Sequence, residues 1–589
     1  MLFVKYVVLL IFTIFLFKQS LASAYSPILK NHEQQRQNIL LDAEINKIEK
    51  IKNNKIENWQ SQEKHKEYSD DFCLNIQKIT LTGNEVFSVK FLLDKFVNLK
   101  KGACVSKNSL ALIKNNLQNF YLKKGYVMAR IYYDLSLLPE NHLKIIIAEG
   151  KLGEIILKDD SWLNNKLKFR RKTNIFSAFP WQKGKILNLK NIEQGLEQIN
   201  ALASNNAIMD MVPSDKEGFS DVIIKNNINK TTNISLSYDN LGSVNTGKNN
   251  KNLKISQDNL LGFNDNILLS FTKDAASDQN AKYSFSNYAK LKIPFSYWEF
   301  NASFAESKYK LTIYSDIENI ISKGSNFNKD FSLFRVLRKT RKQQLDFGFE
   351  TAIKDSKSYN SGELLDDRRL SILRARLKNL QHFQPRKFLK SAFMLTDFSY
   401  HKGMNWFSAE KDENKQFSEP HAQFQKFALS NYLKANFYLF SKNLTFINNS
   451  NMQLSLDELY GSEQISIGGN YSVRGFAANN ISGDSGLYLR NDLIFKLADF
   501  INIPQFSLFT NYADLAVFYD YGMVRKRGSL DKAYLSGAGT ALNFKIYEKN
   551  TKNPKQLNIK LTFSQAIHSP AIFLNDDEET IYFELGVNL

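Results

Sequence analysis

The sequence contains few of the residues that build metal sites or disulfide-rich folds. Its 589 residues include only two cysteines, seven histidines and ten prolines. The histidines are scattered singly and nowhere show the spacing of metal ligands, so the sequence predicts no metal site and no other cofactor. Beyond residue 24 there is no apolar run of 18 residues or more, which argues against a helix that crosses a membrane.

Aromatic residues, in contrast, are abundant, with 45 Phe and 26 Tyr. Residues 1–24 are typical of a secretory signal peptide: Lys5 precedes the 12-residue apolar run Tyr6–Phe17, and Ala22–Ala24 offers small residues for cleavage. A membrane anchor is the alternative, although the run is shorter than the about 20 residues that a spanning helix needs. Export, many aromatics and a mean hydropathy of -0.36 together favour an outer-membrane β-barrel, whose alternating strands hide its hydrophobicity.

The formal net charge is strongly positive, at +19 for the whole chain and +17 once Lys5 and Lys18 are removed with the signal peptide. Nucleic acid and anionic surfaces are common partners of basic proteins. Here the lysines are spread along the chain among many asparagines and isoleucines, so a compositional bias explains most of the charge and no nucleic-acid partner is expected. A basic barrel lumen, or attraction to acidic lipid headgroups, would account for the rest.

The two cysteines, Cys73 and Cys104, both follow the signal peptide. An even and minimal count in an oxidising compartment predicts one disulfide. Such a bond would close a loop of about 30 residues and would add roughly 3–4 kcal/mol of stability by the chain-entropy estimate. Two free thiols are the alternative.

The spacing of apolar residues divides the N-terminal part of the chain into a helical segment and two small domains. Residues 25–70 are polar with Ile and Leu at loosely helical spacing, which predicts one amphipathic helix and a polar linker; a disordered tether is the alternative. Residues 71–150 show the order strand, helix, helix, strand, strand, in which Gly125 ends the second helix and Tyr126–Tyr133 forms the next strand. The order recurs more loosely in residues 151–228, which indicates a tandem pair of small α+β domains.

From residue 229 to residue 589 helical periods vanish and short alternating segments appear, such as Ile234–Tyr238 and Ile267–Phe271. The final segment is the clearest, because every second residue from Ile581 to Leu589 is apolar and would face lipid. At roughly 22 residues for a strand and its connection, this region holds about 16 strands of bilayer length. The chain is therefore expected to combine α+β domains with an all-β, antiparallel transmembrane barrel.

Three short motifs resemble parts of enzyme sites but lack the necessary partners. Gly483–Gly486 matches the nucleophile loop of trypsin-like proteases, yet no positioned base accompanies it, and we interpret it as a polar, flexible loop. Gly242–Lys248 is close to a phosphate-binding loop, but Asn249 replaces the Ser or Thr that would bind Mg²⁺ and no helix is predicted to follow. Gly537–Gly539 lacks the third glycine of a dinucleotide loop. The sequence predicts no enzyme.

Two other motifs fit a barrel lumen better. The first consists of Val473, Arg474, Gly475 and Phe476, and the second of Phe518, Asp520 and Gly522. An arginine that binds a carboxylate through two parallel hydrogen bonds makes a strong and geometrically specific contact. We expect Arg474 and Asp520 to form one buried ion pair, with Gly475 allowing the loop to pass close to the wall and Phe476 anchoring its tip. Unrelated surface loops are the alternative.

These motifs resemble those of two-partner secretion transporters of the hemolysin secretion/activation (ShlB/FhaC/HecB) type, and the resemblance extends over nearly the whole chain. The matching segments are Cys73, Cys104, Lys124–Tyr126 and Ala148–Gly150 in a first POTRA domain, Asn191–Leu196 and Ser204–Ala207 in a second, Asn259–Asp265 in a barrel strand and turn, Gly468–Phe476 and Ser482–Gly486 in a lid loop, and Phe518–Gly522 in the strand that holds this loop.

The resemblance implies a domain order. A signal peptide would occupy residues 1–24, and a plug helix with its linker residues 25–70. Two periplasmic POTRA domains would occupy residues 71–150 and 151–228, and a 16-stranded barrel residues 229–589. The lid-loop motif would be held inside the barrel by the strand motif.

The resemblance also implies a function, in the outer membrane of a Gram-negative bacterium. The POTRA domains would bind a large unfolded exoprotein, an adhesin or a hemolysin, in the periplasm, and the barrel would export it without ATP. Outer-membrane lipid and the barrel-assembly machinery would be further partners, although the family often ends in an aromatic residue and this chain ends in Leu589. The alternatives are a barrel-assembly factor, which usually has more POTRA domains and no plug helix, and a passive channel or surface receptor.

Overall fold

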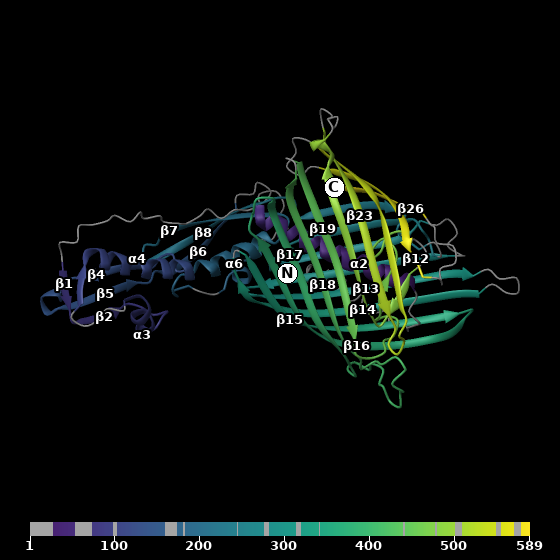
Figure 1. The fold of residues 1–589 in the computed structure, drawn as a ribbon, viewed down its shortest axis with the longest axis horizontal. Helices are drawn as coiled ribbons and strands as arrows, with labels where there is room; N and C mark the ends of the chain where they lie inside the picture. The colour runs from purple at the N-terminus through teal and green to yellow at the C-terminus, as the bar shows by residue number, and fades with distance from the viewer. Residues whose placement is uncertain are drawn as a thin grey trace.

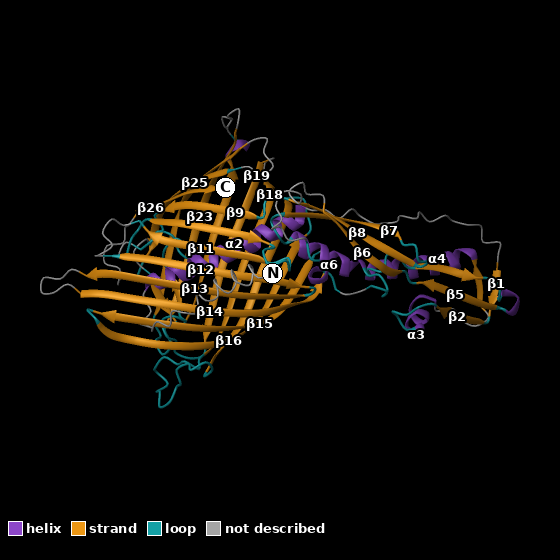
Figure 2. Ribbon diagram, turned by 180° about the vertical axis from the view of Figure 1, so that it is seen from behind, coloured by secondary structure: helices purple, strands orange, loops and turns teal. Residues whose placement is uncertain are grey.

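The computed structural model describes residues 27–53, 73–97, 103–159, 173–180, 183–243, 246–275, 282–313, 320–340, 342–439, 442–476, 480–500, 509–548, 555–570 and 579–589. The molecule is elongated, with a large β-barrel at one end and two small α/β domains that extend from one of its mouths (Figures 1 and 2). The predicted signal peptide and the predicted linker Ser61–Asp70 lie outside the described residues. Among the described residues, no helix combines the length and the apolar character needed to cross a membrane.

The first small domain packs two helical segments on a three-stranded sheet. Its elements are β1 (Cys73–Ile76), β2 (Lys78–Thr82), α3 (Val89–Leu92), the π-helix η1 (Leu93–Val97), β3 (Ala103–Ser106), α4 (Lys107–Lys124), β4 (Arg130–Asp134), the 3-10 helix η2 (Leu138–Glu140) and β5 (His142–Ala148). The central strand β5 is parallel to β2 and antiparallel to β4. Helix α4 buries Leu117 and Tyr121 in the core that Ile145 and Ile147 of β5 also enter.

Two local predictions for this domain have different outcomes. Helix α4 ends at Gly125, which has a left-handed φ of 99°, as its position after the last apolar residue predicts. The predicted strand Tyr126–Tyr133 is wrong in its first half, because the amide of Ala129 donates to the carbonyl of Tyr126 (3.2 Å) and closes a turn. The strand therefore begins only at Arg130.

The second small domain repeats the sheet of the first. Its elements are β6 (Lys151–Asp159), α5 (Ile175–Ala178), α6 (Leu189–Asn200), β7 (Asn205–Pro213) and β8 (Phe219–Ile228). The central strand β8 is parallel to β6 and antiparallel to β7, as β5 is to β2 and β4. Ile192, Leu196 and Ile199 of α6 are buried in its core, at the helical spacing that the sequence shows.

Sixteen antiparallel strands form the closed barrel, in agreement with the predicted number. They are β9 (Thr232–Asp239), β10 (Asn250–Asp258), β11 (Asn266–Asp274), β12 (Tyr283–Phe295), β13 (Trp298–Ile313), β14 (Ile320–Lys339), β15 (Gln343–Asn360), β16 (Glu363–Phe383), β17 (Leu389–Met404), β18 (Gln425–Leu439), β19 (Lys442–Ser455), β22 (Ser485–Lys496), β23 (Phe509–Arg525), β24 (Lys532–Glu548), β25 (Gln556–His568) and β26 (Glu579–Asn588), and the 3-10 helix η4 (Leu497–Asp499) follows β22. The last strand alternates as predicted, since Ile581 is 53% exposed and Tyr582 only 3%.

Two segments lie inside the barrel. Helix α2 (Pro27–Asn53) runs through the lumen, where both views place it behind the strands of the wall (Figures 1 and 2). The described part of the connection between β19 and β22, residues 456–476 and 480–484, carries the short strands β20 (Ile465–Ile467) and β21 (Ile481–Gly483), which pair with each other. We call this connection the lid hairpin.

The second small domain is fixed to the turns at one mouth of the barrel. Gln194 and Gln198 of α6 both donate to the carbonyl of Ser296, each at 3.1 Å, in the turn between β12 and β13. Asn174 donates to the carbonyl of Gly262 (3.0 Å) in the turn between β10 and β11. These contacts set the mouth of the barrel next to the domain that precedes it in the chain.

Candidate functional site

The tip of the lid hairpin is inserted into an apolar cluster on the inner wall. Val473 and Phe476 are 0% and 2% exposed, respectively. They pack with Tyr488, Val524 and Leu535, which come from three neighbouring strands, β22, β23 and β24. The lid motif of the sequence is therefore buried against the wall and not exposed on a surface loop.

Arg474, the next residue of the lid hairpin, contacts Asp520 of β23 through three hydrogen bonds. Its Nε and Nη2 donate to the two carboxylate oxygens at 2.6 and 2.8 Å, and its backbone amide donates at 3.1 Å. The guanidinium also lies 3.5 Å from the ring centre of Phe518. The structure thus brings together the residues of both motifs in a bidentate, charge-assisted contact that is closed to water.

Asp492 of β22 is a further partner that the sequence reasoning missed. Nη1 of Arg474 donates to its carboxylate at 2.7 Å, so one guanidinium joins the lid to two neighbouring strands. Arg490 and Asp492 occupy alternate positions of β22 between apolar Leu489 and Leu493. This alternation, read together with the predicted lumen, was the signal that could have identified Asp492.

Three glycines allow the lid to approach the wall. Gly475 has a φ of 103°, and a Cβ atom there would lie 2.8 Å from the amide nitrogen of Ala566 in β25. A Cβ atom at Gly522 would lie 2.8 Å from Val473. At Gly537 of β24 it would lie 1.9 Å from the carbonyl oxygen of Arg474, so this glycine serves as a seat for the lid and not as part of a nucleotide loop.

The segment Gly483–Gly486 is not the flexible loop that the sequence suggested. Asp484 is 1% exposed and accepts hydrogen bonds from the amides of Leu459 (2.9 Å) and Arg527 (2.7 Å) and from the side chain of Gln464 (3.0 Å). A buried carboxylate needs such donors, and they fix the base of the lid hairpin to the loop after β23. The prediction failed because these partners are distant in sequence.

Helix α2 connects the lid hairpin with the second small domain. Near its start, Lys30 donates to the hydroxyl of Ser482 and Gln34 to the carbonyl of Ser466 (3.1 Å), both in the lid hairpin. Near its end, Lys50 donates to the carbonyls of Leu202, Ala203 and Asn205 at 2.6, 3.0 and 2.6 Å, in the turn between α6 and β7. The helix therefore spans the lumen from the second small domain to the lid hairpin.

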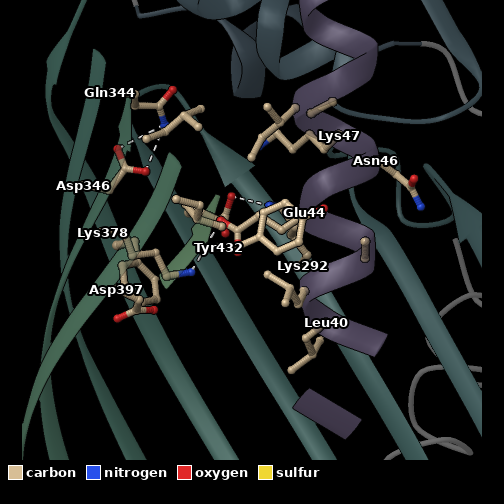
Figure 3. A pocket seen from close by; sticks show the side chains of 18 of the residues that line it. Leu40, Glu44, Asn46, Lys47, Lys292, Gln344, Asp346, Lys378, Asp397 and Tyr432 are labelled. Atoms are coloured by element: carbon tan, nitrogen blue, oxygen red, sulfur yellow. Dashed lines mark hydrogen bonds and ion pairs between the residues drawn. The ribbon is translucent and has the colours of Figure 1, made fainter. Parts of the chain in front are cut away.

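The sides of α2 contact the wall as well. Arg36 pairs with Asp330 at 3.0 Å. Glu44 lies 3.8 Å from Lys378, a contact visible in Figure 3, and Glu49 lies 2.6 Å from Lys434. A cavity of about 2730 Å³ extends between the helix, the wall and the second small domain. The helix occupies the lumen but does not fill it.

Comparison with known proteins identifies this architecture. The model of the haemolysin secretion/activation protein family ShlB/FhaC/HecB matches residues 218–545, more than half of the chain. The chain belongs to this family. A ShlB-type POTRA model matches residues 74–150 and a second POTRA model residues 151–213, so the two small domains are POTRA domains.

Relatives and a solved structure agree with this assignment. The outer membrane transporter CdiB of Dickeya dadantii is 29% identical over 394 residues, which cover 66% of this chain and 67% of CdiB. The hemolysin transporter protein HpmB of Proteus mirabilis is 24% identical over 532 residues, 84% of this chain and 87% of HpmB. The structure of CdiB from Escherichia coli has a TM-score of 0.80 at 23% identity and covers 96% of this chain and all of that one, which supports the fold.

The chain is thus an outer-membrane transporter of the two-partner secretion type, with its POTRA domains in the periplasm. In POTRA 1 of this transporter, Glu149 accepts from the hydroxyl of Tyr121 (2.6 Å) and from the amide of Glu85 (2.8 Å). Burial and the neighbouring Glu149 raise the pKa of Tyr121 above its usual range. The Ala148–Gly150 motif thereby joins helix α4 to the loop after β2.

The joint between the two POTRA domains uses the motif Lys124–Tyr126. The amide of Leu189 donates to the carbonyl of Gly125 at 2.8 Å. A Cβ atom at Gly125 would lie 2.4 Å from the side-chain oxygen of Asn188, the residue that caps α6. Gly125, which ends α4, is therefore also a contact point for POTRA 2.

The remaining sequence motifs form no site for a ligand. The amide of Gly242 donates to the carbonyl of Lys248 (2.8 Å), which closes the connection between β9 and β10 on itself, with no helix after it to bind phosphate. Within the described residues, no group of three His, Cys, Asp or Glu side chains has the geometry to hold a metal ion. Cys104 is disulfide-bonded, and the pairing of β3 with β1 places Cys73 on the adjacent strand.

Proposed function

We propose that the transporter binds one large unfolded exoprotein, an adhesin or a hemolysin, through its POTRA domains and exports it through its barrel. No ATP would be consumed, and the chain would catalyse no reaction of its own. Folding of the exported chain outside the cell would give the process its direction. Outer-membrane lipid and the barrel-assembly machinery would be the other partners, and nucleic acid would not be one.

The observation that carries the proposal is the path of α2. A helix that occupies the lumen, is held at Lys50 by POTRA 2 and at Lys30 by the lid hairpin, blocks the same route that an extended chain would take. A pore for small solutes has no need of such a link to the domains in front of its mouth. We infer that α2 leaves the lumen when a partner engages the POTRA domains.

The sheet of POTRA 2 offers an edge to the partner. In the order β6-β8-β7, no described strand pairs with the outer edge of β7, and Ile208 of this strand is 58% exposed. The start of β6 is less open, because Leu152 exchanges backbone hydrogen bonds with Gly184 and Lys185. An extended segment can add to an edge such as that of β7 through main-chain hydrogen bonds. Strand addition would suit an unfolded partner, because it needs backbone and not a folded surface.

The contact of Arg474 with Asp492 and Asp520 would keep the lid hairpin on the wall during export. This role rests on its burial, since the side chains of Arg474 and Asp520 are only 3% and 0% exposed. Separating them would leave an unpaired charge in a closed site. The lid would then act as a fixed lining of the pore, and α2 as its removable plug.

Quantitative proteomics of culture supernatant and outer membrane, in a host with and without the gene, tests the proposal. We expect the loss of one large secreted protein, with other outer-membrane proteins unchanged, and this result would also identify the cargo. A general fall in outer-membrane proteins would contradict it and assign the chain to barrel assembly. An unchanged set of secreted proteins would assign it to passive transport.

We further propose that Cys73 and Cys104 form the disulfide of POTRA 1. It would tie β1 to β3 at the edge of the domain. Replacing both by Ser should destabilise POTRA 1 by roughly 3–4 kcal/mol, measured by hydrogen exchange of the full chain. A thiol-specific mass tag that labels the wild-type chain without reductant would contradict the bond.

A further inference from the structure

The inner wall of the barrel has an excess of positive charge where it surrounds α2. Among the described strand residues that line the cavity, eleven are Lys or Arg and six are Asp or Glu. Rings and rows of basic side chains in a pore attract anions, most strongly when the walls exclude bulk water. Part of the net positive charge of the chain is therefore concentrated on the wall of the lumen, and a bias of composition alone does not explain it.

Carboxylates of α2 face several of these cations. Glu44 lies 3.8 Å from Lys378 of β16, and Glu49 lies 2.6 Å from Lys434 of β18. Asp42 interacts electrostatically with Lys254 of β10. Among the described residues, α2 provides the only carboxylates within ion-pair distance of Lys378 and Lys434.

Two wall lysines line the cavity without a direct partner. Lys254 and Lys290 make no hydrogen bond and no ion pair with any residue that the structure describes, although Lys290 lies near enough to Glu44 for their charges to interact. We call Lys254, Lys290, Lys378 and Lys434 the plug-facing lysines. They lie on β10, β12, β16 and β18, around the same helix.

Several other charges of the wall keep ion-pair partners when α2 is absent. Glu463 of the lid hairpin binds Lys354 (2.5 Å) and Lys426 (3.0 Å), and a lid that stays on the wall keeps this one carboxylate beside both lysines. Asp330, which binds Arg36 of α2, also lies 3.4 Å from Arg374 of the wall. Removal of the helix therefore takes the ion-pair partners from Lys378 and Lys434, whereas Asp330 keeps Arg374.

We propose that the plug-facing lysines form a binding track for acidic stretches of the exported polypeptide. Aspartate and glutamate side chains of the passing segment would take the places of Asp42, Glu44 and Glu49. The proposal rests on the departure of α2 described under Proposed function. Such pairs would be exposed to lumen water and individually weak, which suits a chain that has to move on.

Fluorescence anisotropy of a labelled 20-residue oligoglutamate with the purified full-length transporter, at low ionic strength, tests the track. Oligoglutamate should bind at least about tenfold more tightly than oligoglutamine, and oligolysine should not bind. The variant Lys254→Gln/Lys378→Gln/Lys434→Gln should lose this preference. The variant Lys183→Gln/Lys225→Gln/Lys411→Gln, which removes the same charge from exposed positions outside the lumen, should keep it.

A second variant tests the track even if α2 stays in the lumen and keeps its ion pairs with the lysines. Glu44→Gln/Glu49→Gln frees Lys378 and Lys434 whether or not α2 moves, and should strengthen oligoglutamate binding several-fold. Equal binding of the acidic and neutral peptides by the wild type and by this variant would overturn the track, as would full binding by the lumen triple variant. Export of the cargo, scored separately in cells, decides the proposed function: normal export with no peptide preference would refute the track alone.

Discussion

The two segments inside the barrel are held in different ways. The lid hairpin is fixed by Arg474, whose contact with Asp520 is 3% and 0% exposed and is made through three hydrogen bonds. The side contacts of α2 are more varied. Glu44 and Lys378 are 38% and 19% exposed and 3.8 Å apart, whereas Arg36 and Asp330 are 11% and 10% exposed and 3.0 Å apart. Breaking a buried pair costs about 3–5 kcal/mol, and an exposed pair contributes about 0–1 kcal/mol. We propose from the comparison of the Arg474–Asp520 and Glu44–Lys378 pairs that the lid is permanent and the plug removable.

The largest effect should follow from breaking the lid contact. Asp520→Ala leaves Arg474 buried with only Asp492 as a carboxylate partner, so the lid should detach and secretion should fall by more than about tenfold, the factor that corresponds to 1.4 kcal/mol. Cargo in the supernatant is measured by immunoblot, and heat-modifiable mobility in electrophoresis reports the folded barrel. Asp514→Ala, at a half-exposed position of the same strand, is the matched control. Wild-type secretion by both Asp520→Ala and Arg474→Ala would refute a role for the contact.

A smaller effect on secretion should follow from adding a side chain at Gly537, where the lid approaches the wall. Gly537→Ala places a methyl group 1.9 Å from the carbonyl of Arg474, and such overpacking costs about 1–3 kcal/mol. Secretion should fall several-fold while the barrel stays folded. Gly586→Ala, where the nearest atom would lie 3.6 Å away, should secrete normally. If the two variants behave alike, the lid does not depend on this seat.

Loosening the plug should increase a measured quantity, the open fraction of the channel, whereas the two changes to the lid should decrease secretion. Lys50→Ala removes the hydrogen bonds to Leu202, Ala203 and Asn205, worth about 2 kcal/mol for a charged donor. The open fraction of single channels in planar bilayers should increase about tenfold or more. Lys47→Ala, one turn earlier on the helix, is the control. A closed Lys50→Ala channel would show that POTRA 2 does not hold the plug.

The smallest effect is expected at the side of the plug. Glu44→Gln removes a partly exposed pair, so the open fraction should change by no more than about twofold to fivefold. The change should shrink in 0.5 M salt, where screening reaches only a few ångströms. An effect as large as that of Lys50→Ala would show that the side contacts of α2 hold the helix as strongly as the contacts at its end.

The sequence predicted the features that depend on local pattern. Alternation at Ile581–Leu589 predicted the last strand, and the position of Gly125 predicted the end of α4. The pairing of Arg474 with Asp520 followed from two motifs that resemble those of a family. Each of these signals lies within a few residues, where side-chain period or a turn residue determines the backbone.

The resemblance predicted a plug helix and a lid loop inside the barrel, but most of the residues that these segments contact there were not predicted. Gly537 and Lys50 meet their partners only because the lid and α2 lie inside a closed barrel, and their neighbours in sequence carry no sign of this. Asp484 was misread as part of a flexible loop for the same reason. Asp492, in contrast, was missed although its alternation with apolar residues on β22 was such a sign. Strand alternation shows which side chains point inward, but not what they contact there.

Distance measurement between spin labels during export tests the central claim most directly. Full-length transporter labelled at Gln37 of α2 or at Asn480 of the lid hairpin, each paired with a label at Ser361 in the turn between β15 and β16, would be measured with and without unfolded cargo. We predict that cargo broadens and shifts the Gln37–Ser361 distance and leaves the Asn480–Ser361 distance unchanged. A lid distance that shifts while the plug distance stays fixed would contradict the account.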